Sequence, residues 1–201
     1  MTAPSVGNIL TPKTPFVQCP QCEQKLPLRT TGPERESSAV WRCSACHEPA
    51  VGYCEQALLM RNPQSILLDD RYFDVSGQPK IDAEERRKAC ELTNRAATAK
   101  QLERRRSARV SQSLVAPAVA LSSNLMPHGT PFWAIVANLS CEGVGLVHLG
   151  RIESEFIAMQ LGSQEDSPIQ VIVRLVRHLQ LEEPYFEIGG EFFLRLGSLS
   201  V

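Results

Sequence analysis

Two pairs of cysteines near the N-terminus constrain the fold of this chain more than any other feature. Each pair has the spacing C-x-x-C, with Cys19 and Cys22 in the first and Cys43 and Cys46 in the second. Zinc binds four thiolates in a tetrahedron, and each tight C-x-x-C loop supplies two of them. The spacing therefore predicts one structural zinc site that has these four cysteines as its ligands.

The rest of the composition favours metal-binding thiols over disulfides. The chain of 201 residues has seven cysteines, an odd number, and no basic N-terminal region followed by an apolar core. No apolar run is long enough to span a membrane. We therefore expect a cytoplasmic protein with reduced cysteines and no membrane partner. Its net charge of −1 means that any site for a polyanion must be local.

The cysteines lie in a segment, residues 16–60, that resembles a zinc ribbon, in which β-hairpins carry the two cysteine loops. The preceding residues 1–15 are rich in Thr, Pro and Ser, and we expect a disordered tail there. The ribbon has too small a core to fold alone, and a bound metal contributes on the order of 10 kcal/mol to folding. His47 and Cys54 lie nearby but do not improve on the four-cysteine set.

Residues 61–103 are predicted to form a linker and then a helix, which spans about residues 82–104. Asp82 is a suitable N-cap, and the charge runs from acidic to basic along the segment, which complements the helix dipole. A narrow apolar stripe at helical spacing consists of Ala89, Leu92, Ala96, Ala99 and Leu102 or Glu103. We expect a solvated helix that bridges two domains or, alternatively, a helix that pairs with a partner along this stripe.

Residues 104–201 have the pattern of β-structure. Runs of Val, Ile, Leu and Phe are broken by Gly, Pro, Asn and Ser, and no helical segment interrupts them. Six strands are expected, near residues 114–121, 131–139, 144–149, 155–161, 169–181 and 185–196. This pattern predicts a closed antiparallel barrel or a sandwich and excludes a parallel α/β sheet.

Two short motifs flank the start of this β-rich half. The first is R-x-x-x-R, made of Arg105 and Arg109 and preceded by Arg104. The second is N-x-S-x-x-G, with its defined positions at Asn138, Ser140 and Gly143. A guanidinium binds a phosphate or the O6/N7 edge of guanine through paired hydrogen bonds. In the second motif the amide and hydroxyl lie two residues apart on one side of a strand, and the glycine permits a positive φ and a close backbone approach.

This order of motifs resembles a PilZ domain, a family of six-stranded antiparallel barrels of which many bind cyclic di-GMP. The resemblance includes the segment Phe186–Phe192 and covers about residues 103–196. It implies that the arginine motif contacts phosphate and guanine from a mobile linker, and that the N-x-S-x-x-G motif holds guanine on the barrel. Arg104 further implies two ligand molecules per site, because members with arginine at this position tend to bind an intercalated pair.

The resemblance implies a cyclic di-GMP receptor without enzymatic activity. Ligand binding would fold the arginine linker and reposition the zinc ribbon, which would contact a protein or a nucleic acid; a protein could also bind through the helix. Many members have a C-terminal helix that covers the barrel, and we expect the helix at 82–104 to cover it here.

Two other functions remain open from the residues alone. A zinc ribbon with an arginine run is also typical of nucleic-acid-binding proteins, although the near-zero net charge disfavours this. The barrel could instead be a non-binding scaffold for protein contacts, in which the arginine run is a solvated helix end and N-x-S-x-x-G is an ordinary hairpin turn. Catalysis is not expected, because His128, His148 and His178 are isolated and no nucleophile–base pair is evident.

Overall fold

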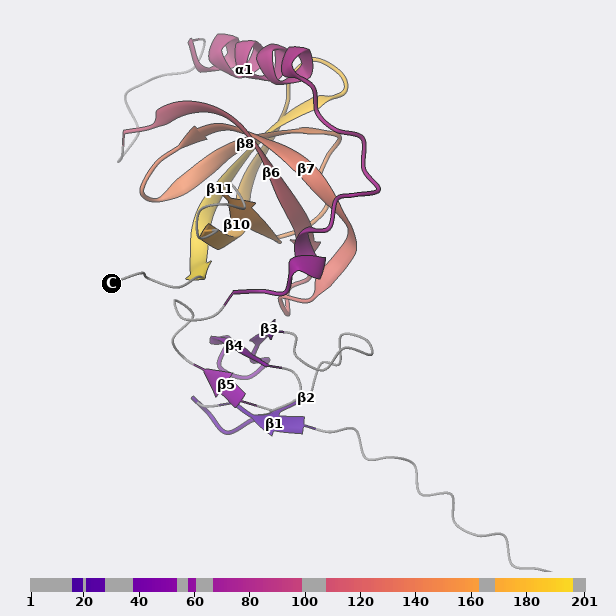
Figure 1. The fold of residues 1–201 in the computed structure, drawn as a ribbon. Helices are drawn as coiled ribbons and strands as arrows, with labels where there is room; N and C mark the ends of the chain where they lie inside the picture. The colour runs from indigo at the N-terminus through magenta and orange to yellow at the C-terminus, as the bar shows by residue number, and fades with distance from the viewer. Residues whose placement is uncertain are drawn as a thin grey trace, which may run out of the picture.

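The computed structural model describes residues 16–19, 21–27, 38–53, 58–60, 67–98, 108–162 and 169–196. These residues form a small N-terminal module that carries the cysteine pairs, a 3-10 helix, an α-helix and a β-barrel (Figure 1). The prediction of a mainly β fold with an N-terminal four-cysteine cluster and a connecting helix is confirmed. The predicted tail at 1–15 lies outside the described residues.

Six antiparallel strands close into a barrel in the order β10-β11-β8-β7-β6-β9. Their bounds are β6 (Val110–Leu121), β7 (Pro127–Leu139), β8 (Gly143–Leu149), β9 (Phe156–Leu161), β10 (Ile169–Gln180) and β11 (Tyr185–Leu196). Closure pairs every strand on both sides, so the barrel has no open edge that could bind another strand. The sequence predicted either a closed barrel or a sandwich, and the structure is the closed barrel.

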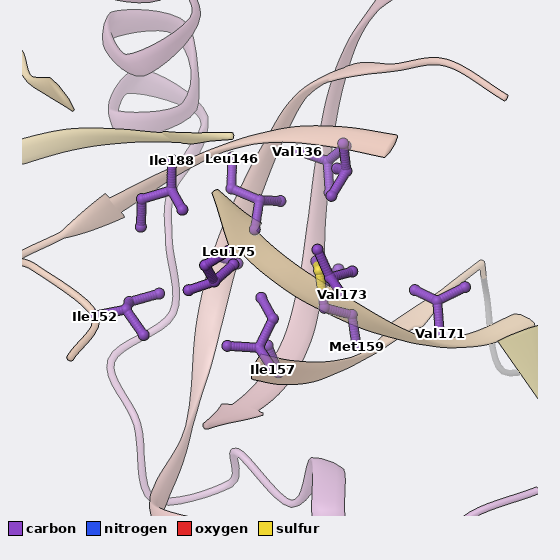
Figure 2. Packing of buried hydrophobic residues seen from close by; sticks show 13 residues of the cluster. Val136, Leu146, Ile152, Ile157, Met159, Val171, Val173, Leu175 and Ile188 are labelled. Carbon is purple, nitrogen blue, oxygen red and sulfur yellow. The ribbon is translucent and has the colours of Figure 1, made fainter. Parts of the chain in front are cut away.

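Apolar side chains from all six strands fill the barrel interior (Figure 2). Successive residues of a strand face opposite sides, so alternate positions point inward. Completely buried examples from five of the strands are Val136, Leu146, Met159, Val173 and Ile188. The apolar runs from which the strands were predicted supply these inward positions, and all six strands lie where they were expected, although β6 and β7 each begin four residues earlier.

The outer face of β7 and β8 is apolar as well, and α1 (Ala83–Thr98) covers it. Ala89 of the helix is completely buried in a cluster with Ile135 and Val147, and Leu92 packs against the same cluster. The helix therefore covers the barrel, which is the role expected for it in place of a C-terminal helix. The predicted continuation of the helix beyond Thr98 lies outside the described residues.

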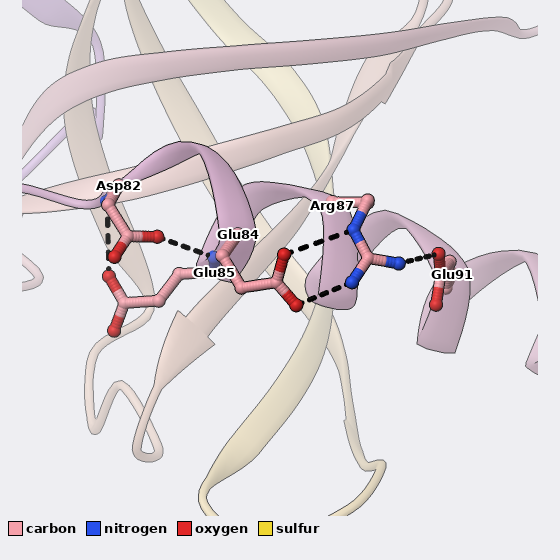
Figure 3. A network of polar contacts seen from close by, with 5 residues as sticks. All are labelled: Asp82, Glu84, Glu85, Arg87 and Glu91. Atoms are coloured by element: carbon pink, nitrogen blue, oxygen red, sulfur yellow. Dashed lines mark hydrogen bonds and ion pairs between the residues drawn. The ribbon is translucent and has the colours of Figure 1, made fainter.

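A reciprocal pair of side-chain hydrogen bonds starts α1 (Figure 3). Oδ1 of Asp82 accepts from the backbone N–H of Glu85 at 2.8 Å, and Oε2 of Glu85 accepts from the N–H of Asp82 at 3.2 Å. This capping box confirms the predicted N-cap. One turn further, Arg87 bridges Glu84 and Glu91 on the exposed side of the helix.

Within the described residues no helix has the length and apolarity needed to cross a bilayer.

A second apolar outer face lies on β6, β9 and β10. Val119, Ala158 and Ile172 are cross-strand neighbours there, on the side opposite the interior positions. Leu68 and the 3-10 helix η2 (Asp70–Phe73) pack against them. Part of the linker predicted between the cysteines and the helix thus covers the barrel.

The cysteine module completes the cover of this second face. It consists of the hairpin β1 (Phe16–Gln18) and β2 (Lys25–Pro27) and the sheet β3 (Ser38–Arg42), β4 (Pro49–Tyr53) and β5 (Leu58–Met60). Val40 and Val51 are at most 1% exposed and belong to the same hydrophobic cluster as Leu121, Phe156 and Leu196 of the barrel. Figure 1 shows the module and α1 on opposite sides of the barrel.

A buried glutamine fixes the segment that follows the module. Gln170, only 1% exposed on β10, accepts a hydrogen bond from the N–H of Leu68 at 2.5 Å and donates to the carbonyl of Leu68 at 3.2 Å. Its amide also donates to Oε1 of Gln160 at 3.3 Å. One side chain thus satisfies both backbone groups of a buried residue more than a hundred positions away.

We expect Gln170→Leu to lower the free energy of unfolding by about 1–3 kcal/mol, because it leaves the buried backbone groups of Leu68 without partners. Urea denaturation of the full chain measures the change. Gln180→Leu, at the exposed end of the same strand, is the matched control and should change stability by less than about 0.5 kcal/mol. Equal stability of the two variants would contradict the role assigned to Gln170.

Candidate functional site

The four predicted metal ligands meet at one point. The Sγ atoms of Cys19 and Cys46 are 3.7 Å apart, those of Cys22 and Cys43 are 3.5 Å apart, and all four lie within 4.8 Å of one another. A tetrahedral zinc ion with Zn–S bonds of about 2.3 Å places its sulfurs about 3.8 Å apart. The donor set and its spacing therefore fit a tetrahedral metal ion held by four thiolates.

The two cysteine loops have the same backbone conformation. In the first loop the N–H of Glu23 donates to the carbonyl of Cys19 at 2.9 Å. In the second loop the N–H of His47 donates to the carbonyl of Cys43 at 2.9 Å. Glu23 and His47 both adopt positive φ, 62° and 60°. Two different sequences share this rare conformation, which indicates that the position of the sulfurs determines the loop. His47, considered earlier as an alternative ligand, is an exposed turn residue.

The thiols affect one another's protonation. Burial raises the pKa of the Cys43 thiol, but hydrogen bonds from the backbone of Cys46 and Ala45 outweigh burial and lower that pKa to about 7. A backbone hydrogen bond with Glu48 lowers the pKa of Cys46, but burial and the neighbouring thiols raise it to about 12. Once one thiol of the cluster has lost its proton, deprotonation of a second thiol is therefore disfavoured. A divalent cation removes this repulsion, so metal binding would release protons.

Arg42 connects the cysteine cluster to the barrel. It directly precedes Cys43, and its guanidinium lies 5.4 Å from the ring centroid of Phe156 and 5.6 Å from that of Phe193. Its Nε also donates to the carbonyl of His47 at 3.2 Å. Each cation–π contact contributes about 0.5–2 kcal/mol. Sequence reasoning missed this residue, because nothing in a local pattern shows that distant aromatic rings will lie beside it.

The N-x-S-x-x-G motif forms the turn between β7 and β8. Oγ of Ser140 accepts from the N–H of Gly143 at 3.1 Å and from that of Glu142 at 3.3 Å. The backbone N–H of Ser140 donates to the carbonyl of Gly143 at 2.9 Å. The hydroxyl that was expected to face a ligand is therefore engaged in closing the turn.

Gly143 is required for a close approach between strands. A Cβ atom at this position would overlap the carbonyl oxygen of Gly190 on β11. The expected close backbone approach is thus present, whereas the expected positive φ is not: in the described residues positive-φ glycines occur at 129, 150 and 162. The glycine serves strand packing rather than turn conformation.

The two motifs meet through Arg109 and Asn138. Nη1 of Arg109 donates to Oδ1 of Asn138 at 3.3 Å, although the residues are 29 positions apart. Gly145 lies opposite Asn138 in the β7–β8 register, and a Cβ there would come within 2.5–2.8 Å of three carboxamide atoms of Asn138. Gly145 therefore makes the space in which this carboxamide lies. Sequence reasoning missed Gly145, and its place two residues after Gly143 is the only local signal for it.

Not every predicted ligand residue can be placed. Arg104 and Arg105 lie outside the described residues, so their expected contacts remain predictions. Among the described residues, the structure brings together Arg109, Asn138 and the turn closed by Ser140. We call this group, with Gly143 and Gly145, the barrel-surface site.

Comparison with known proteins adds little to this geometry. No protein-family model matches the chain, and no curated protein matches it. Among solved structures, the inhibitor of motility MotI/DgrA from Bacillus subtilis resembles it over 47% of this chain and 44% of that chain. The aligned parts are 16% identical with a TM-score of 0.34. The likeness thus spans less than half of either protein, and at this TM-score it carries no argument.

Because Val40, Val51 and Arg42 dock on the barrel, we expect metal loss to destabilise the barrel itself. The chain has two tryptophans, so the variant Trp41→Phe leaves Trp133 of β7 to report on the barrel. Loss of the module's contacts with the barrel, about 3 kcal/mol, should lower the thermal unfolding midpoint of the barrel by roughly 6–12 °C. Trp133 fluorescence, recorded during heating with and without a metal chelator, measures this midpoint.

In the same background, Cys43→Ser should have the effect of the chelator and abolish bound metal in elemental analysis. Cys141→Ser removes an exposed thiol outside the cluster and is the control that should keep both the metal and the midpoint. An unchanged Trp133 transition after complete metal removal would show that the barrel does not depend on the module.

Proposed function

We propose that the chain is a cytoplasmic receptor for cyclic di-GMP, with a PilZ-type barrel, a structural zinc ion and no enzymatic activity. The observation that carries this proposal is the hydrogen bond between Arg109 and Asn138, because it joins the two motifs on one surface. Cyclic di-GMP contains two phosphates and two guanines. Arg109 offers a guanidinium for a phosphate, and Asn138 offers a carboxamide for a guanine.

The chemistry of this pair suits the ligand. A guanidinium carries five N–H donors in a fixed plane, so Arg109 can bond to Asn138 and to a phosphate at the same time. The amide of Asn138 can donate to the O6 or N7 acceptors of guanine. Arg104 and Arg105 would supply further guanidinium groups, and Arg104 would support the second ligand molecule that the sequence resemblance implies.

Ser140 and Gly143 support the site from behind in this proposal. The turn that they close fixes the end of β7 and therefore the position of Asn138. Their substitution should weaken binding through the geometry of the turn and not through a lost ligand contact. Asn138 is then the residue of the motif that faces the ligand.

A physical route leads from this turn to the cysteine module, which we propose as the output element. The carbonyl of Glu142 accepts from the N–H of Phe192 on β11 at 2.9 Å, and the next residue, Phe193, packs against Arg42. Because the module shares a hydrophobic cluster with the barrel, ligand binding would shift it slightly and would not release it. A protein or nucleic-acid partner would then sense this shift on the module or on α1.

Calorimetric titration of the full chain with cyclic di-GMP tests the receptor function. We expect binding by the wild type, with two ligand molecules per chain. Arg109→Ala and Asn138→Ala should each weaken binding about tenfold or more, as expected for a lost hydrogen bond to a charged group. Gly145→Ala should have a similar effect, because the new methyl group displaces the Asn138 carboxamide.

Gly77→Ala is the control, since a Cβ there meets no atom within 4 Å. Absence of binding by the wild type would overturn the receptor function. Salt-sensitive binding to arbitrary nucleic acid that Asn138→Ala does not affect would instead favour a nucleic-acid-binding protein.

Hydrogen exchange with and without cyclic di-GMP tests the route to the module. We expect slower exchange in peptides that contain Phe192 and in peptides that contain Arg42. Arg42→Gln should abolish the effect in the module and keep it in β11, because it removes the cationic contact with Phe193. Protection confined to the barrel-surface site in the wild type would contradict the route.

A further inference from the structure

The barrel-surface site continues across the barrel as a row of register partners. Asn138 of β7 lies opposite Gly145 of β8, which lies opposite Gly189 of β11, which in turn lies opposite Arg177 of β10. Directly opposed residues of antiparallel strands face the same side, so these four positions share one outer surface. At about 4.8 Å per strand, Asn138 and Arg177 are about 14 Å apart along this surface. The two positions between them have no side chain.

The two ends of the row are occupied by side chains that lie over the glycines. The Asn138 carboxamide occupies the space above Gly145, as described for the site. At the far end, a Cβ at Gly189 would meet Cβ of Arg177 at 3.5 Å and its Nε at 3.6 Å. The Arg177 side chain therefore lies along the backbone of Gly189, and it is 50% exposed.

An ion pair with Glu187 holds Arg177 in this position. The Glu187 side chain is only 8% exposed, and a carboxylate this buried is strongly disfavoured without its cation. The edge of the guanidinium that faces Glu187 is therefore committed to that contact. The exposed half of Arg177 leaves the flat face of the guanidinium as the part best suited to contact a ligand.

We propose that Arg177 is a stacking platform for a purine base, at the opposite end of the row from Asn138. The proposal rests on the receptor function above and assigns to it a contact outside both sequence motifs. Guanidinium planes stack on aromatic rings, whereas an ammonium group does not provide such a face. Because Gly189 has no side chain, the Arg177 side chain lies against the backbone, and a planar base can stack on the outer face of its guanidinium. A ligand with two guanines would thus be read by hydrogen bonds at one end and by stacking at the other.

A neighbouring arginine shows what distinguishes Arg177. Arg174, on the same strand, also pairs with a glutamate of β11, Glu191, at 2.6 Å. Its register partner is Glu191 itself, so a side chain fills the place that Gly189 leaves open beside Arg177. Both members of this second pair are about half exposed, and neither lies over a glycine of the row. Arg174→Ala is therefore the matched control for loss of a β10 arginine.

Titration of full-length variants with cyclic di-GMP tests the platform. We expect Arg177→Ala to weaken binding about tenfold, Arg177→Lys to restore little of the loss, and Arg174→Ala to bind as the wild type does. Because Arg177→Ala leaves Glu187 buried without a cation, the double variant Arg177→Ala, Glu187→Gln tests the same surface without that charge. It should bind as weakly as Arg177→Ala, with a thermal midpoint closer to that of the wild type.

The outcomes separate this inference from the receptor function. If Arg109→Ala binds more weakly than the wild type while the double variant binds like the wild type, the platform is overturned and the receptor function stands. Full affinity in Arg177→Lys would also overturn it, since charge alone would then suffice. If the wild type does not bind at all, the receptor function fails, and the platform fails with it.

Discussion

Burial of the barrel's outer apolar faces is the constraint on which the rest of this structure depends. A barrel this small fills its interior with side chains, and here apolar residues also occupy the outside of several strands. At roughly 25 cal/mol per Å² of apolar area, such faces cannot remain in water without a large loss of stability. α1 covers the face on β7 and β8, and η2 with the cysteine module covers the face on β6, β9 and β10.

This arrangement makes the cysteine cluster part of the barrel's folding. The core of the module around the cysteines is small, and two of its buried members are Cys19 and Cys43 of the four-cysteine cluster. Without a cation, a first thiolate disfavours a second, and backbone hydrogen bonds such as those from Glu23 to Cys19 and from His47 to Cys43 are left to hold the loops. The β3 strand that delivers Arg42 and Val40 to the barrel ends at the second loop, so a metal ion bound by the cluster would also stabilise that strand.

The features that the sequence predicted correctly are those that local chemistry decides. Apolar runs broken by turn residues located the strands, the C-x-x-C spacing located the four-cysteine cluster, and Asp82 marked the start of the helix. Gln170, Arg42 and Gly145 could not be found in this way, because each acts on a residue from another part of the chain. A buried glutamine within a strand has no local signature, and its role becomes evident only when Leu68 is seen beside it.

The N-x-S-x-x-G motif shows how a binding motif can consist largely of structural residues. Ser140 closes the turn and Gly143 lets β8 approach β11, so both already have structural roles. Their fixed spacing follows from the geometry of that turn, and its result is the placement of Asn138 above Gly145. Arg109 already bonds to this carboxamide, so in the proposed receptor a guanine would share or replace that contact. The affinity of the site would therefore depend on how the arginine linker is held before the ligand arrives.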